Sequence, residues 1–107
     1  MDAFTALADP NRRRILELLG VRPHPAGEIG AHLPISAPAV SQHLKALREA
    51  ELVRVEVQGQ RRIYSLNPAG LDEFDAWTRR VRGFWHARLD DLESELKTDI
   101  PGGHDHG

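Results

Sequence analysis

The side chains in this sequence best suited to chemistry are hydrogen-bond donors and cations, gathered in two short stretches. Ser41, Gln42 and Lys45 fall in the first stretch, and Arg61 and Arg62 are neighbours in the second. Hydroxyl, amide, ammonium and guanidinium groups bind phosphate oxygens and the polar edges of nucleic-acid bases. The two stretches therefore predict recognition of a polar, anionic ligand.

Residue patterns typical of catalysis or metal binding are missing. The sequence contains no cysteine, which excludes disulfides, thiolate metal ligands and cysteine nucleophiles. Ser41 and His43 are two positions apart, and side chains at that spacing on a helix do not face each other. The sequence also has no glycine-rich phosphate loop. We therefore expect neither enzyme activity nor a cofactor.

Length and composition indicate one small domain. The chain has 107 residues, of which 28% are charged, and a formal net charge of −2. Residues 1–68 hold nine basic and seven acidic side chains, whereas residues 69–107 hold five and nine. An anionic partner would therefore meet the first part. A folded chain of this length buries only about two thirds of its unfolded surface, so a long apolar helix face would complete its burial in a homodimer.

We expect a cytoplasmic protein without a membrane segment. No stretch approaches the roughly 18 apolar residues of a membrane span, and the N-terminus lacks the basic and apolar regions of a secretion signal. Residues 98–107 are rich in Gly and His, which predicts a disordered segment. His104 and His106 could bind a metal there, although histidines in a flexible segment more often do so adventitiously.

Apolar residues three or four positions apart predict four helices in the first half of the chain. Asp9 and Pro10 form the start signal of the second helix, because Asp caps a helix and Pro fits its first position. Gly20 ends that helix. The predicted ranges are 2–8, 10–20, 26–33 and about 37–50.

The fourth predicted helix has one apolar face and one polar face. Ser36 is a good N-cap, and Val40, Leu44 and Leu47 form the inward stripe. His43 lies about 60° from the centre of that stripe, which leaves a half-buried histidine and a phosphate contact as alternatives. The outward and flanking positions are Pro38, Ser41, Gln42, Lys45 and Glu49.

After Leu52 the apolar pattern changes to a period of two, which predicts a strand. Gln58 to Gln60 carry a turn signal around Gly59, and a second strand over 61–66 completes a hairpin. Residues 69–97 then place an apolar side chain every three or four positions over about seven turns. This segment is predicted to be a long helix.

This order of elements is mainly α with a small β-hairpin, and it predicts a winged helix-turn-helix. An α-helix fits the major groove of duplex DNA, while a basic hairpin contacts phosphates or the minor groove. We therefore expect double-stranded DNA as the partner. The expected DNA-binding residues are Ser36, Ala37, Pro38, Ser41, Gln42, His43, Lys45, Arg61 and Arg62.

Three stretches resemble the ArsR/SmtB-type bacterial transcriptional repressors. They are residues 4–19 (FTALADPNRRRILELL), 39–53 (AVSQHLKALREAELV) and 59–66 (GQRRIYSL). Their order and spacing make the resemblance specific, and it covers approximately residues 3–97. The resemblance implies a homodimer, joined through its first and last helices, that binds an inverted-repeat operator and represses transcription. The expected interface residues are Phe4, Leu7, Phe74, Trp77, Val81, Trp85, Leu89 and Leu92.

The metal-sensing patterns of that family are not matched. Residues 28–33 (EIGAHL) stand where the third helix of metal sensors carries a Cys-x-Cys-type pair. His86 is the only histidine of the last helix, and Leu89 follows it where a sensor has His or Glu. The chain resembles a branch without these motifs, and any effector is unidentified. Two alternatives stay open: a winged helix that binds another protein, and a metal-responsive repressor that uses His104 and His106.

Overall fold

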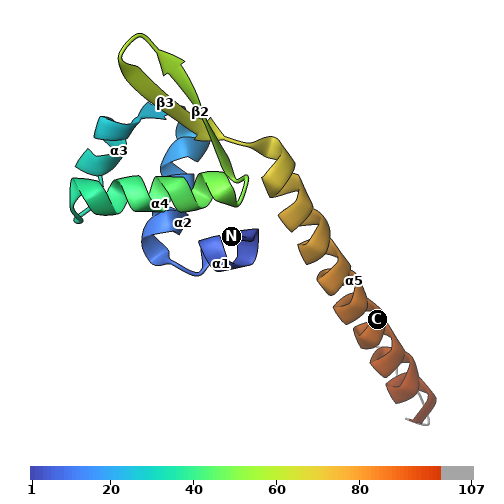
Figure 1. Cartoon of the computed structure of the whole chain (residues 1–107). Coiled ribbons are helices and arrows are strands. Elements are labelled where there is room, and N and C mark those ends of the chain that lie inside the picture. Colours follow the sequence, from blue (N-terminus) through green and yellow to red (C-terminus); the bar gives the residue numbers. More distant parts are fainter. Residues whose placement is uncertain (100–107) are drawn as a thin grey trace. The chain divides into compact units, whose positions relative to one another are not determined.

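The computed structural model describes residues 1–99 and the side chains of residues 1–96. The chain forms two compact units, Met1–Phe74 and a second unit from Asp75 onward. The elements, shown in Figure 1, are α1 (Ala3–Leu7), α2 (Pro10–Val21), β1 (His24–Pro25), α3 (Ala26–Ala31), α4 (Ala37–Glu49), β2 (Val53–Gln58), β3 (Arg61–Leu66) and α5 (Pro68–Asp99). This order confirms the predicted winged helix-turn-helix and adds one short strand.

The predicted helix starts are confirmed by their capping hydrogen bonds. Asp9 Oδ1 accepts from the backbone N–H groups of Asn11 at 2.8 Å and Arg12 at 3.2 Å, and Pro10 occupies the first position of α2. Ser36 Oγ accepts from the N–H of Ala39 at 3.3 Å. Each cap pairs backbone donors that have no partner within the helix, which is why α2 and α4 begin where they do.

One apolar core in the first unit holds α4 in place. It brings together the apolar stripes of α2, α3 and α4 with the sheet. Burial of a large aliphatic side chain of this kind contributes about 1.5–3 kcal/mol. The predicted inward stripe of α4 is confirmed, and the outward face of α4 stays exposed. The largest fully buried side chains are Ile15, Ile29, Leu44, Leu47 and Leu52.

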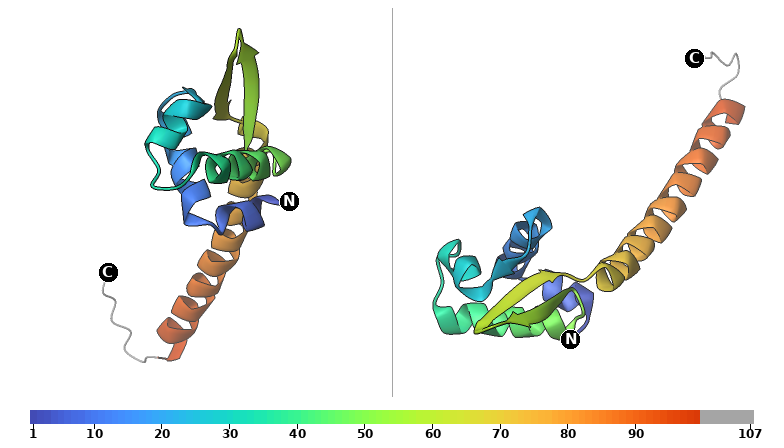
Figure 2. Two further views of the ribbon diagram at one scale, coloured as in Figure 1. Left: turned by 60° about the vertical axis from the view of Figure 1, so that its left-hand side comes forward. Right: turned by 90° about the horizontal axis from the view of Figure 1, so that it is seen from above.

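The hairpin belongs to a three-stranded antiparallel sheet with the order β1-β3-β2. β2 pairs with β3 from Val53 opposite Leu66 to Gln58 opposite Arg61, and Gly59 in the connecting loop has a φ of 65°. The hairpin extends away from the helices of the first unit (Figure 2). The sequence pattern does not predict β1, because two residues are too short to show a periodicity.

A residue in the left-handed conformation ends α4. Glu51 has a φ of 60°, its N–H donates to Arg48 O at 2.9 Å, and the N–H of Leu52 donates to Leu47 O at 3.0 Å. Glycine is the usual residue at this position of a Schellman motif. Gly70 of α5 packs on the same turn, where a Cβ would come within 2.8 Å of the carbonyl carbon of Glu51. Glycine at position 70 therefore permits this close approach.

Helix α5 begins at a capped turn and is longer than predicted. Asn67 Oδ1 accepts from the N–H of Ala69 at 3.2 Å. The helix continues through Asp99, so Thr98 and Asp99 are helical and the prediction of disorder from residue 98 is wrong at these two positions. His104 and His106 lie outside the described residues. No helix in the described part of the chain has the length and apolar character needed to cross a membrane.

Candidate nucleic-acid interface

The outward face of α4 presents the polar side chains that the sequence predicts. Ser41, Gln42 and Lys45 are all exposed, whereas Val40 and Leu44 are buried on the other side. The helical repeat places the three polar side chains within about 100° of one another around the axis. They combine a hydroxyl, an amide and an ammonium group, which can pair with base edges and with phosphates.

The start of α4 adds a second set of predicted contacts. Ser36, Ala37 and Pro38 are exposed. The hydroxyl of Ser36 accepts a bond from Ala39 N–H and keeps its own proton to donate. The partial positive charge of a helix N-terminus favours an anion near this end. The first turn of α4 is therefore compatible with a phosphate.

The two wing arginines point to opposite faces of the hairpin. Arg61 pairs across the strands with Gln58, and Arg62 pairs with Val57. Side chains alternate along a strand, so these neighbours cannot share one face. Arg62 lies two positions before buried Tyr64 on β3 and therefore shares its face of the sheet. The exposed guanidinium groups thus present two separate basic surfaces instead of one patch.

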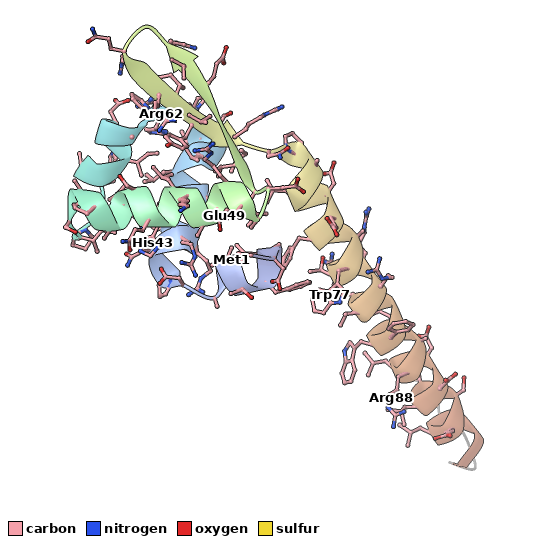
Figure 3. All side chains as sticks on the ribbon, viewed as in Figure 1. Met1, His43, Glu49, Arg62, Trp77 and Arg88 are labelled. Atoms are coloured by element: carbon pink, nitrogen blue, oxygen red, sulfur yellow. The ribbon has the colours of Figure 1, made fainter. Side chains whose placement is uncertain are left out.

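His43 is placed differently from its polar neighbours on α4. Its side chain is only 17% exposed and lies on the side of α4 that faces the α1–α2 segment (Figure 3). Its Nδ1 is 3.4 Å from Arg12 Nη1, and its Nε2 is 4.0 Å from Asp9 Oδ1. These contacts favour the half-buried alternative, and a phosphate contact by His43 stays a prediction.

Two arginines at the start of α2 bind the backbone of α1. Arg12 Nε donates to Ala6 O at 2.7 Å, and Arg13 Nη1 donates to Leu7 O at 2.8 Å. Both pair carbonyl groups at the end of a helix too short to pair them itself. Sequence reasoning misses the further contact of Arg12 with His43, because the two residues are far apart in the chain and no local pattern links them.

The carboxylate of Asp9 remains ionised at neutral pH. Partial burial acts to raise the pKa of Asp9, but the backbone N–H groups of Arg12 and Asn11 and the electrostatic influence of the His43 and Arg12 side chains outweigh it and lower that pKa. A negative oxygen therefore stays beside the His43 ring.

The residues predicted to form a dimer interface fall into two groups. Phe4 and Phe74 contact each other within the chain, with ring centroids 5.5 Å apart, and Leu7 packs partly against the core. The second group lies along α5 at helical spacing, with side chains 41–57% exposed. These are Trp77, Val81, Trp85, Leu89 and Leu92. Leu96 extends the same stripe and is 59% exposed.

Within the described part of the chain, buried polar side chains are paired and potential metal ligands are dispersed. Within it, no group of three or more His, Asp or Glu side chains could hold a metal ion. Every buried side-chain nitrogen or oxygen there has a hydrogen-bond partner. Ser41 and His43 do not form a pair, since the His43 ring faces Arg12 and Asp9.

Comparison with known proteins agrees with this geometry. Residues 7–56 match the family model described as a helix-turn-helix domain. The HTH-type transcriptional regulator Rv2034 of Mycobacterium tuberculosis is 46% identical over 100 residues, covering 87% of this chain and 90% of the relative. The transcriptional repressor SdpR of Bacillus subtilis is 41% identical over 76 residues, covering 71% and 84%.

A solved structure is similar to this chain in fold and related to it in sequence. The ArsR-like transcriptional regulator from Rhodococcus sp. RHA1 superposes with a TM-score of 0.71 at 31% identity, covering 85% of this chain and 86% of that one. The relatives of this chain named above are thus regulators of transcription, and the solved one has the same fold. The chain belongs to the ArsR/SmtB-type family of winged helix-turn-helix transcriptional regulators, whose members bind DNA.

Proposed function

We propose that this protein is a sequence-specific, dimeric repressor that binds an inverted-repeat operator in the cytoplasm. The observation that carries the proposal is the exposed polar strip of α4, Ser41, Gln42 and Lys45, on a helix that the core holds rigidly. Side chains at base edges specify a sequence, and basic side chains on phosphates set the position. Arg61 and Arg62 of the wing are the basic partners of this strip.

Repression and dimerisation are inferred from different sources. Repression rests on relatives such as SdpR, which is named a transcriptional repressor. Dimerisation rests on the exposed apolar stripe of α5, because a stripe of several large apolar side chains on one helix face is costly to leave in water. A two-fold dimer that binds an inverted repeat must present its two copies of α4 about 34–36 Å apart, one turn of DNA.

The proposed repressor acts without a metal. The whole chain has no cysteine, and the described part has no cluster of metal ligands. Hard and borderline metals need several such ligands in one place.

An unbiased selection of bound duplexes tests this function. The purified full chain is mixed with a pool of random duplexes, and the bound duplexes are recovered and sequenced. The selection is run in the presence and absence of a chelator and at several salt concentrations. We expect an inverted repeat that is enriched equally with and without the chelator. Enrichment only in the absence of the chelator would favour a metal-responsive repressor. A pool with no enriched sequence would contradict the proposal and favour a protein partner.

Substitution of Gln42 and of Arg62 should separate base reading from phosphate binding. Gln42→Ala is expected to weaken binding to the selected duplex by about 1–3 kcal/mol. The variant should lose its preference for a particular base at one position of each half-site and keep it at the others. Arg62→Ala should weaken binding to every duplex and reduce the salt slope by about 1, because one phosphate contact is lost. Fluorescence anisotropy over a range of salt concentrations measures both. Equal behaviour of the two variants would contradict this division of roles.

A further inference from the structure

Arg12 connects three segments of the first unit through one guanidinium group. Its Nε donates to Ala6 O at 2.7 Å, and its Nη2 donates to Thr5 O at 3.3 Å. Its Nη1 lies 3.4 Å from Nδ1 of His43 on α4. The planar, branched guanidinium group can make these contacts at once, which a lysine ammonium cannot do at the same positions. Arg12 therefore links the last carbonyls of α1 to α4.

The imidazole of His43 completes this link on a second side. Its Nε2 lies 4.0 Å from Asp9 Oδ1, the oxygen that also caps α2. Arg12 has only donors to offer, so a hydrogen bond between the two side chains requires Nδ1 of His43 to accept, which leaves Nε2 as the ring N–H that faces the Asp9 carboxylate. One tautomer thus suits both neighbours. We call Asp9, Arg12 and His43 the α1–α4 clamp.

His43, the member of the clamp that lies on α4, is placed apart from the exposed polar strip of that helix. The His43 side chain is 17% exposed, and its ring nitrogens have Arg12 of α2 and Asp9, the N-cap of α2, as neighbours. Gln42 and Lys45 on the same helix are exposed. A side chain whose polar atoms face other elements of its own chain controls where its helix lies, whereas an exposed one can contact a ligand.

We propose that the α1–α4 clamp is a specificity-determining device that holds α4 in the register needed to read bases, without touching DNA itself. This inference rests on the proposed function, in which α4 lies in the major groove. Bidentate contacts to base edges need their groups held to within about 0.5 Å. Attraction between basic side chains and phosphates falls off slowly with distance and tolerates such shifts. Loss of the clamp should therefore reduce specific binding more than nonspecific binding.

Arg13 provides a matched control for the charge and for the capping of α1. It also donates to carbonyl groups at the end of α1, at 2.8 Å to Leu7 O and 3.2 Å to Ala8 O. These hydrogen bonds reach α1 and the turn after it, not α4. Arg13→Gln thus removes the same charge and the same kind of cap as Arg12→Gln, but leaves the contact with His43 in place.

The experiment compares the affinity of each full-length variant for the selected duplex and for a scrambled duplex, at several salt concentrations. Arg12→Gln and His43→Leu are each expected to lower the ratio of specific to nonspecific affinity on the order of tenfold. Arg13→Gln should leave that ratio within about twofold of the wild type. His43→Asn should recover most of the ratio, because its amide oxygen can still accept a bond from Arg12. The double variant R12Q/H43L should lose no more than the more damaged single variant.

Circular dichroism at the assay temperature checks that each variant is folded. If His43→Leu is unfolded, the comparison of Arg12→Gln with Arg13→Gln and with His43→Asn still tests the clamp. Equal ratios for Arg12→Gln and Arg13→Gln would overturn the clamp, as would losses that multiply in the double variant. A salt slope reduced by about 1 in His43→Leu would assign His43 to a phosphate contact instead. A wild type that does not distinguish the two duplexes would overturn the proposed function, and the role of the clamp with it.

Discussion

Trp85→Glu is expected to convert dimers of this protein into monomers and to lower its affinity for an inverted repeat by about 10²–10⁴-fold. Trp85 is 57% exposed in the middle of the α5 stripe, with Val81 and Leu89 on either side at helical spacing. A carboxylate there would have to be buried without a partner when two stripes meet, and such burial costs several kcal/mol. A monomer would bind each half-site separately and lose the advantage of linked binding.

Light scattering coupled to size-exclusion chromatography measures the mass, and anisotropy with the selected duplex measures the affinity. Ala87→Glu is the matched control, because Ala87 is exposed on the opposite side of α5 and receives the same charge. The control should remain dimeric and bind DNA like the wild type. A dimeric Trp85→Glu variant would place the interface elsewhere and remove the support that the α5 stripe lends to the dimer.

Gly70→Ala is expected to destabilise the fold by about 1–3 kcal/mol, even though alanine favours helices. A Cβ at this position would overlap the backbone carbonyl of Glu51, which cannot rotate away like a flexible side chain. Either the start of α5 or the turn after α4 must then shift. Because Glu51 is already held at a φ of 60°, the turn has little freedom to relax.

Gly83→Ala is the control for this prediction. Gly83 also lies in α5, but a Cβ there would meet nothing within 4 Å. Alanine should therefore stabilise the chain by about 1 kcal/mol through helix propensity alone. Chemical unfolding at one protein concentration compares the two variants, since the stability of a dimer depends on concentration. A Gly70→Ala variant as stable as Gly83→Ala would show that the turn accommodates the methyl group.

Local signals in the sequence account for most of the fold. Asp9 with Pro10 and Ser36 predict the starts of α2 and α4, and both caps are present. The change to a period of two predicts the β2–β3 hairpin, since side chains alternate along a strand. In each case the determining interaction lies within a few residues of the signal. Strand β1 escapes prediction because only its pairing with Tyr64 and Ile63, far along the chain, makes it a strand.

The residues of the candidate site also fall into those that local signals predict and those that only long-range packing places. The sequence by itself determines that Ser41, Gln42 and Lys45 share the outer face of a helix, because the helical repeat and the buried stripe leave no other side for them. It also determines that an apolar stripe follows in α5. Only the tertiary structure decides that His43 faces Arg12 and Asp9. The physical reason is range: helical periodicity and capping act over a few residues, whereas a contact between α2 and α4 exists only after the core has packed these helices together.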